Sequence, residues 1–255
     1  MKLVLENLDG LIWLIILLIP FNLIQNQVHK ELQTIFYLIT RKKKYAIWVF
    51  AILFFPGVVI HEISHLVAAK LLGVKTGRFS IIPKPVPGGQ LQMGYVEIGK
   101  TDWLRSSLIG AAPLISGGSL IAYVAVNYFK LPVLWGQLVS GQSELFWTGI
   151  KLLPQENYFW LLAYLVFVVS STMLPSDSDR NSWLPLGLTM GVLLVVVLLV
   201  GAGPWLMDNI APSINAVFNG LAMVIGLSGV LHILIYLPVF GIHKLLSRLT
   251  GYDIL

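Results

Sequence analysis

The segment HEISH, residues 61–65, places two histidines and a glutamate inside the otherwise apolar run FFPGVVIHEISHLVAAKLLG. Residues four apart lie on the same face of a helix, so His61 and His65 can direct their imidazole nitrogens at one metal ion. Glu62 lies next to them, where a carboxylate can take a proton from a water molecule at that ion. The spacing HExxH is that of zinc hydrolases, and it predicts a Zn²⁺ cofactor.

The apolar surroundings of this segment strengthen the metal interpretation. An ionisable side chain at the centre of a membrane-spanning helix costs about 2.5–3.5 kcal/mol on insertion scales and needs a partner. A bound cation is the natural partner for two imidazoles and a carboxylate. The alternative is that the three side chains line a polar helix contact or a proton path without metal.

A catalytic zinc ion usually has three protein ligands, so a third ligand must come from another segment. Asp177 and Asp179 in SSTMLPSDSDRNSW are the best candidates, because they follow an apolar segment that ends on the same side as the HEISH helix. His29 and His243 lie near polar ends, and we expect them to be solvated or interfacial. We expect His232 to be a hydrogen-bonded contact of the last helix.

The composition is that of a membrane protein. Of the 255 residues, 56% are hydrophobic and 11% are charged, whereas a soluble domain carries about 25% charged residues. We therefore predict an all-α polytopic protein with one membrane domain, residues 1–255, in contact with the lipid bilayer. Lysine and arginine cluster at the ends of apolar segments, which excludes a nucleic-acid footprint, and the lack of cysteine excludes thiolate sites.

Six apolar segments approach the roughly 20 residues that a membrane span needs. Residues 25–44 mix polar and apolar positions and end in RKKK, which predicts a basic interfacial segment, so that residues 1–45 form an N-terminal helix plus that segment. One long helix over residues 9–40 is the alternative. The six segments are residues 9–25, 46–72, 104–128, 157–175, 184–203 and 213–240, the last two in the C-terminal part, 181–255.

Residues 74–103 differ from the rest of the chain. The runs FSIIPKPV and QLQMGYVEI flank Pro87-Gly88-Gly89 and predict a re-entrant, β-hairpin-like loop at about residues 78–100. Proline cannot donate a ladder hydrogen bond, so the proline-rich first run is at best an edge strand and the second run is the better strand.

Four of these motifs together resemble the site-2 proteases, which are intramembrane zinc metalloproteases. HEISH matches the metal motif of that family, and PGGQLQMGYV is similar to its Gly-Gly and Gly-Tyr-Val loop. GAAPLIS, residues 110–116, resembles the segment that opens the next helix of the family, and MLPSDSD stands where the family has a proline followed by a metal-binding aspartate. The resemblance covers about residues 46–180.

The resemblance implies a three-helix metalloprotease core over residues 46–180 and assigns roles to particular residues. His61, His65 and Asp179 become the zinc ligands, with Asp177 in reserve, because the family spacing after the proline is nearer five residues. Glu62 becomes the catalytic base that activates a zinc-bound water. Substrate contacts are implied for five residues of the loop: Gln90, Met93, Gly94, Tyr95 and Val96.

The function that the resemblance implies is hydrolysis of a peptide bond in a transmembrane protein substrate. The location it implies is the bacterial cytoplasmic membrane or an organelle membrane of bacterial origin.

The chain departs from the family pattern at two places: it lacks the usual asparagine before Pro175, and Ser178-Asp179-Arg180 replaces the usual Leu-Asp-Gly. These departures favour an alternative, a non-proteolytic subunit or chaperone of a larger complex with other membrane subunits, whereas the intact Glu62 opposes it. A proton-coupled transporter ranks last, because two similar halves with paired broken helices are not found.

Overall fold

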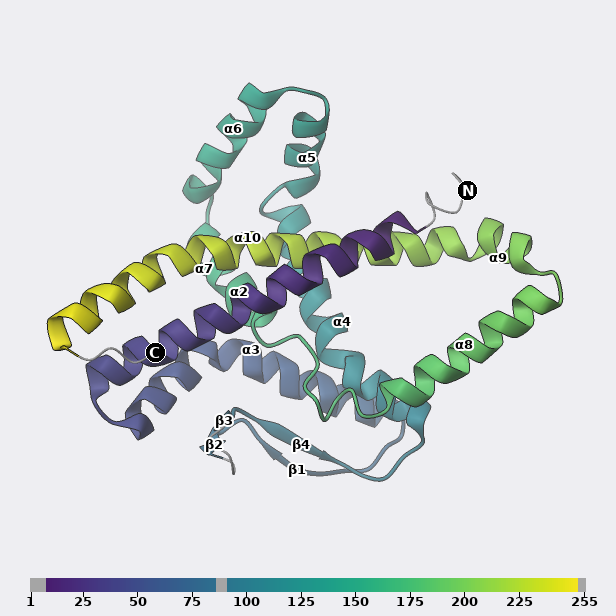
Figure 1. The fold of residues 1–255 in the computed structure, drawn as a ribbon, viewed down its shortest axis with the longest axis horizontal. Coiled ribbons are helices and arrows are strands. Elements are labelled where there is room, and N and C mark those ends of the chain that lie inside the picture. Colours follow the sequence, from purple (N-terminus) through teal and green to yellow (C-terminus); the bar gives the residue numbers. More distant parts are fainter. Residues whose placement is uncertain (1–7, 86–90, 252–255) are drawn as a thin grey trace.

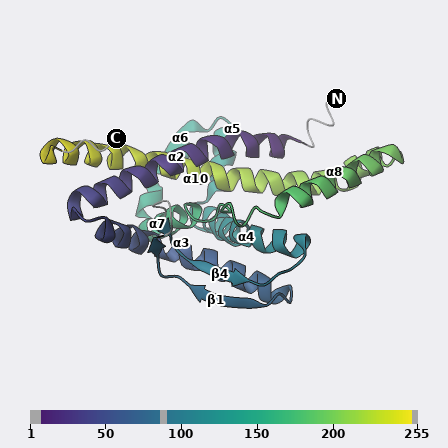
Figure 2. The same ribbon diagram turned by 60° about the horizontal axis from the view of Figure 1, so that its bottom comes forward.

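The computed structural model describes residues 8–85 and 91–251 and consists mostly of helices in layers (Figures 1 and 2). The long helices α2 and α10 form one layer, and α3, α4 and α7 lie beneath it. A small β-hairpin covers α3 on the far side of that second layer. The helices are α2 (Asp9–Thr40), α3 (Lys43–Leu71), α4 (Trp103–Asn127), α5 (Leu131–Val139), α6 (Ser143–Leu152), α7 (Phe159–Ser170), α8 (Trp183–Leu199), α9 (Gly203–Asn209) and α10 (Ala211–Thr250), with a 3-10 turn at Leu153–Gln155.

Helices α2 and α10 form the largest helix interface, and they run parallel to each other. Near their starts, the backbone N–H of Gly10 donates to the side-chain oxygen of Asn215 at 2.9 Å. Near their ends, Glu31 and His243 form a close ion pair. Because α2 is continuous over Asp9–Thr40, the structure agrees with the one-long-helix alternative and not with a separate segment after residue 25.

Helices α3 and α7 also run parallel, and they pack closely enough to exclude side chains between them. The hydroxyl of Tyr164 donates to the carbonyl of Leu53 at 2.7 Å. One turn further along both helices, a Cβ atom at Gly57 would collide with the carbonyl oxygen of Val168. Close packing at Gly57 therefore brings the end of α7 next to the HEISH turn of α3.

The number of long apolar helices indicates a multi-pass membrane protein, as predicted. Four described helices, α2, α3, α4 and α10, are long and apolar enough to cross a bilayer. Two further candidates are bent pairs: α6 with its 3-10 turn meets α7 at 94°, and α8 meets α9 at 115°. The predicted spans 157–175 and 184–203 are thus parts of broken segments. Residues 129–156, which lie between two predicted spans, contain the helices α5 and α6.

The predicted hairpin is present. Strand β1 (Thr76–Ser80) pairs antiparallel with β4 (Tyr95–Ile98), and the register shifts at a bulge between Thr76 and Phe79. Strands β2 (Lys84–Pro85) and β3 (Leu91–Gln92) pair nearer the turn. The turn itself, with the predicted contact Gln90, lies outside the described residues. Each described strand pairs on one edge only, so β4 keeps one open edge.

Candidate metal centre

His61 and His65 face each other from successive turns of α3, with their Nε2 atoms 3.1 Å apart. The Nδ1 atom of His61 lies 2.6 Å from the carbonyl oxygen of Thr172, and that of His65 lies 2.9 Å from the carbonyl oxygen of Ile109. A carbonyl oxygen only accepts, so both Nδ1 atoms carry a proton and donate it. The two Nε2 lone pairs then point into one small space, where they repel each other unless a cation or a proton lies between them.

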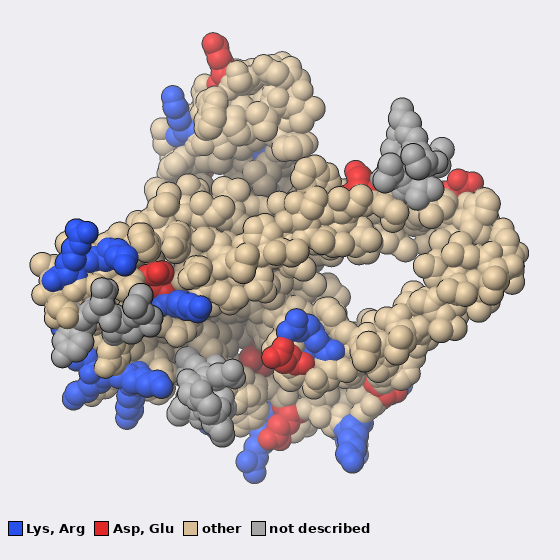
Figure 3. Space-filling model, viewed as in Figure 1, with Lys and Arg blue, Asp and Glu red and all other residues tan. Residues whose placement is uncertain are grey.

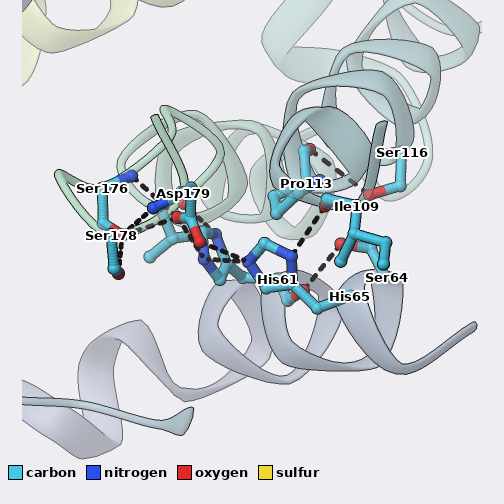
Figure 4. A network of polar contacts seen from close by, with 10 residues as sticks. His61, Ser64, His65, Ile109, Pro113, Ser116, Ser176, Ser178 and Asp179 are labelled. Atoms are coloured by element: carbon cyan, nitrogen blue, oxygen red, sulfur yellow. Dashed lines mark hydrogen bonds and ion pairs between the residues drawn. The ribbon is translucent and has the colours of Figure 1, made fainter. Parts of the chain in front are cut away.

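Asp179 completes the group from the loop between α7 and α8 (Figure 4). Its Oδ1 lies 3.4 Å from Nε2 of His65, and its Oδ2 lies 3.9 Å from Nε2 of His61. The backbone N–H and the hydroxyl of Ser176 both donate to Oδ2, at 2.8 and 2.6 Å. Ser176 thus holds one carboxylate oxygen and leaves Oδ1 turned toward the histidines.

The charge of Asp179 suits a ligand of a cation. Burial alone would raise the pKa of this carboxyl, but hydrogen bonds from protonated His65 and from Ser176 outweigh burial and lower the pKa to about 2. The carboxylate is therefore ionised at neutral pH. A metal ion would take the place of the proton on Nε2 of His65, and an anionic oxygen with two neutral imidazoles then matches the donor set of a catalytic zinc site with three protein ligands.

Two of the three separations in this group fit a tetrahedral ion, and the third is longer, since the nearest carboxylate oxygen of Asp179 lies 3.9 Å from Nε2 of His61. Metal–ligand bonds of about 2.0–2.1 Å at tetrahedral angles place two ligand atoms about 3.3 Å apart. The observed separations are 3.1 Å between the imidazole nitrogens and 3.4 Å from His65 to Asp179. Both histidines also donate their other ring N–H to a backbone carbonyl, which is the usual outer support of metal-binding imidazoles. This group could hold a metal ion.

Glu62 lies on the same turn of α3 and is buried, with 7% of its surface exposed. Gly94 of the hairpin packs directly on it, since a Cβ atom at position 94 would lie 2.7 Å from Cγ and Oε1 of Glu62. The hairpin therefore covers the carboxylate that the sequence assigns as the base.

The three candidate ligands and Glu62 line one cavity of about 1630 Å³. Met93, Gly94, Tyr95 and Val96, the predicted substrate contacts that the structure describes, line the same cavity. Figure 4 shows the two imidazoles from α3 next to the loop that carries Asp179. The structure thus brings together residues that are more than one hundred positions apart in the chain.

The reserve ligand Asp177 does not join this group. Its side chain is 99% exposed and forms an ion pair with Arg180. Two histidines also differ from expectation: His243 is buried against Glu31, and the ring of His29 packs edge-on against phenylalanines of α3. Both were expected to be solvated or interfacial, and that expectation is wrong. His232 is a hydrogen-bonded contact, as predicted, between Ser171 and the carbonyl of Ser228.

Four supporting residues could not be assigned from the sequence. The carbonyls of Thr172 and Ile109 orient the histidines, and backbone groups leave no pattern in a sequence. Gly110 is the third, because a Cβ atom there would collide with the carbonyl oxygen of Asp179. Ser176 is the fourth, and its position three residues before the aspartate is the usual spacing of a local side-chain bond to the backbone.

Comparisons with protein-family models, curated proteins and solved structures gave no match for this chain. Its own motifs and the geometry of this centre are therefore what indicate its function.

Proposed function

We propose that this protein is an intramembrane zinc endopeptidase of the site-2 protease type, which hydrolyses a peptide bond in a transmembrane protein substrate. The observation that supports it most is the pair of imidazole lone pairs 3.1 Å apart, with an ionised carboxylate at 3.4 Å and a buried glutamate on the same helix turn. His61, His65 and Asp179 would hold the ion. Zinc fits this set of two nitrogens and one oxygen.

A bound zinc ion would supply Lewis-acid chemistry, polarising a carbonyl oxygen and making water more acidic. The carboxylate of Glu62 takes a proton from the attacking water and gives it to the departing amide nitrogen. Hydroxide oxygen is thereby added to the carbonyl carbon, the C–N bond breaks, and an acid and an amine leave. The burial of Glu62 under Gly94 keeps lipid and excess water away from this proton transfer.

A helical substrate hides its backbone hydrogen-bonding groups, so its cleavage site must be unwound first. Strand β4 offers a place for the unwound segment, because its second edge has no partner strand among the described residues. An extended peptide can bind by adding a strand to such an edge. Tyr95 and Val96 of β4 line the cavity, so a peptide on this edge reaches the metal centre.

Metal analysis of the purified protein, together with cleavage of a model transmembrane substrate, tests the proposal. We expect about one zinc ion per chain in the wild type and in Glu62→Gln, because Glu62 is not a ligand. We expect cleavage to fall by about 10²–10⁴-fold in the variant, the usual contribution of a general base.

Two results would contradict this proposal. If the wild-type protein binds no divalent metal, the assignment of a metal centre is wrong. If both proteins cleave equally well, Glu62 is not the general base. Bound zinc without cleavage by either protein would support the second candidate, a non-proteolytic subunit, which the altered loop Ser178-Asp179-Arg180 favours.

A further inference from the structure

The cavity that contains the metal centre extends well beyond it. At the far end, its wall consists of polar side chains from the second half of α2 and the start of α3. Lys30, Gln33, Thr34 and Tyr37 come from α2, and Lys43 comes from α3. The cavity is therefore one continuous space with a metal-binding end and a lysine-bearing end.

The two ends of the cavity carry opposite charges. Its acidic residues, Glu62, Asp177 and Asp179, all belong to the metal-binding end. Lys30 and Lys43 are the cations of the other end, and neither forms an ion pair within residues 8–85 and 91–251. The lysine-bearing end thus has positive charge that no described side chain neutralises.

The acidic residue nearest in sequence to Lys30 is already engaged. Glu31 points to α10, where it pairs with His243. Around this end of the molecule, Figure 3 shows further lysine and arginine side chains gathered where α2 ends and α3 begins. Lys42 and Lys44 belong to that cluster, but they do not line the cavity. They have the character of headgroup anchors, whereas Lys30 and Lys43 border the space that leads to the metal centre.

The distance from the metal centre to each lysine determines how many substrate residues separate the scissile bond from the side chain that the lysine contacts. Lys43 and His61 are 18 positions apart on α3, which corresponds to about 27 Å along the helix axis. Lys30 lies nearer the metal centre, because the ring of its neighbour His29 packs on Phe50 and Phe54 of α3, about 10–16 Å from His61 along the axis. At about 3.4 Å per residue, an extended peptide bound at the metal centre can therefore place one side chain beside Lys30 about three to five residues from the scissile bond, and another beside Lys43 about six to eight residues from it.

We propose that this site selects substrates that carry two acidic residues, one about three to five and one about six to eight positions from the scissile bond, held by Lys30 and Lys43 respectively. The inference rests on the proposed peptidase function and adds its substrate class. An acidic peptide segment fits better than a lipid headgroup, because the lysines share a continuous cavity with the metal centre. Gln33, Thr34 and Tyr37 supply further hydrogen-bonding groups for an extended backbone along the way.

Matched transmembrane substrates test this selection. One series carries a pair of Glu (Glu-Glu), Gln (Gln-Gln) or Lys (Lys-Lys) residues, one about three to five and one about six to eight positions from the cleavage site, on either side of it. In nanodiscs of zwitterionic lipid, we expect the wild type to cleave the acidic substrate about tenfold better than the Gln-Gln substrate, from roughly threefold for each of two partly screened ion pairs. High salt should reduce this ratio.

Variants assign the effect to the two lysines. The ratio of the cleavage rates of the Glu-Glu and Gln-Gln substrates should approach one in Lys30→Gln/Lys43→Gln. In Lys30→Glu/Lys43→Glu, the Lys-Lys substrate should be cleaved faster than the Glu-Glu substrate. The matched control is Lys42→Gln/Lys44→Gln, which removes two cations of the same cluster outside the cavity and should keep the wild-type ratio. Binding of fluorescent acidic and neutral peptides to Glu62→Gln gives the same comparison without catalysis.

The possible results separate this inference from the proposed function. Equal cleavage of the acidic and Gln-Gln substrates by the wild type would overturn the inference and leave the peptidase intact. A loss of anionic-lipid binding in Lys30→Gln/Lys43→Gln, without a change in peptide selectivity, would also overturn it and assign the lysines to a headgroup. Absence of all cleavage, with preferential binding of the acidic peptide retained, would overturn the peptidase and support the anion site.

Discussion

The backbone of Gly94 in the hairpin lies directly on the carboxylate of Glu62 in α3, with no room for a side chain between them. Gly94 and Glu62 are 32 positions apart in the chain. Their contact makes the hairpin part of the wall around the base, so a small change in the hairpin must alter the position of this carboxylate.

We expect Gly94→Ala to reduce cleavage by at least about tenfold while zinc binding is retained. The added methyl group displaces either the carboxylate or the strand, and misplaced catalytic groups cost one to two orders of magnitude. Gly229→Ala is the control, because a Cβ atom there meets nothing within 4 Å. Steady-state cleavage and metal content measure the two effects, and unchanged cleavage in Gly94→Ala would refute the contact.

Gly110 of α4 supports the third ligand from behind. We expect Gly110→Ala to lower zinc affinity about 10–100-fold and to destabilise the fold by about 1–3 kcal/mol, because the new Cβ collides with the backbone of Asp179. Gly118→Ala on the same helix is the matched control, since its Cβ would lie 3.8 Å from the nearest atom, in Leu221. Zinc competition with a chelator and thermal unfolding in detergent measure both quantities, and equal values for the two variants would contradict the prediction.

The two aspartates of the loop should behave differently on substitution. Asp179→Asn should lose at least about 100-fold in zinc affinity, because the amide replaces an ionised ligand oxygen close to His65. Asp177→Asn should bind zinc as the wild type does, because its carboxylate points to solvent and pairs with Arg180. The reverse order of affinities would show that the loop has another conformation when metal is bound.

Ser176 should act as a positioning residue for Asp179. Its backbone N–H and hydroxyl both bond to Oδ2, so Ser176→Ala removes one of two bonds and should weaken zinc binding by about 10-fold. Ser178→Ala is the control, because that hydroxyl contacts Ser176 and not the carboxylate. Ser176→Thr, which keeps a hydroxyl, should restore most of the affinity. Failure of threonine to restore it would indicate a packing defect.

Zinc affinity should fall with decreasing pH, with a slope of no more than two protons per ion. Protons compete with the metal for Nε2 of His61 and His65. Asp179 adds no proton in this range, because its folded-state pKa is about 2, and its charge is lost only as the pH falls toward that value. Titration of zinc affinity between pH 8 and 5 measures the slope, and Asp179→Asn should keep it. A slope that requires a third proton would contradict this assignment.

The HEISH part of the centre could be predicted because it is local. Helical spacing alone places His61, Glu62 and His65 together, whatever the rest of the fold does. The choice between Asp177 and Asp179 could not be made from residue types, since both lie in one loop. It depends on the hydroxyl of Ser176 and on the close approach of that loop to α4, which are tertiary contacts.

The long helix α2 shows a second limit of sequence reasoning. Polar side chains near residue 25 interrupt its apolar pattern and suggested that the membrane-crossing part ends there. In the structure, the side-chain amide of Gln25 is buried and donates to the carbonyl of Ser171 at 2.8 Å. A partner from another helix thus satisfies the polar group, and the helix continues to Thr40.

The parallel packing of α2 and α10 determines the sidedness of the chain. Two neighbouring helices that run in the same direction and both cross a bilayer must start on the same face, so an even number of passages separates their starts. If both helices cross, the start of α2 and the end of α10 lie at opposite faces of the bilayer, with Lys244 and Arg248 on the same face as residues 41–44.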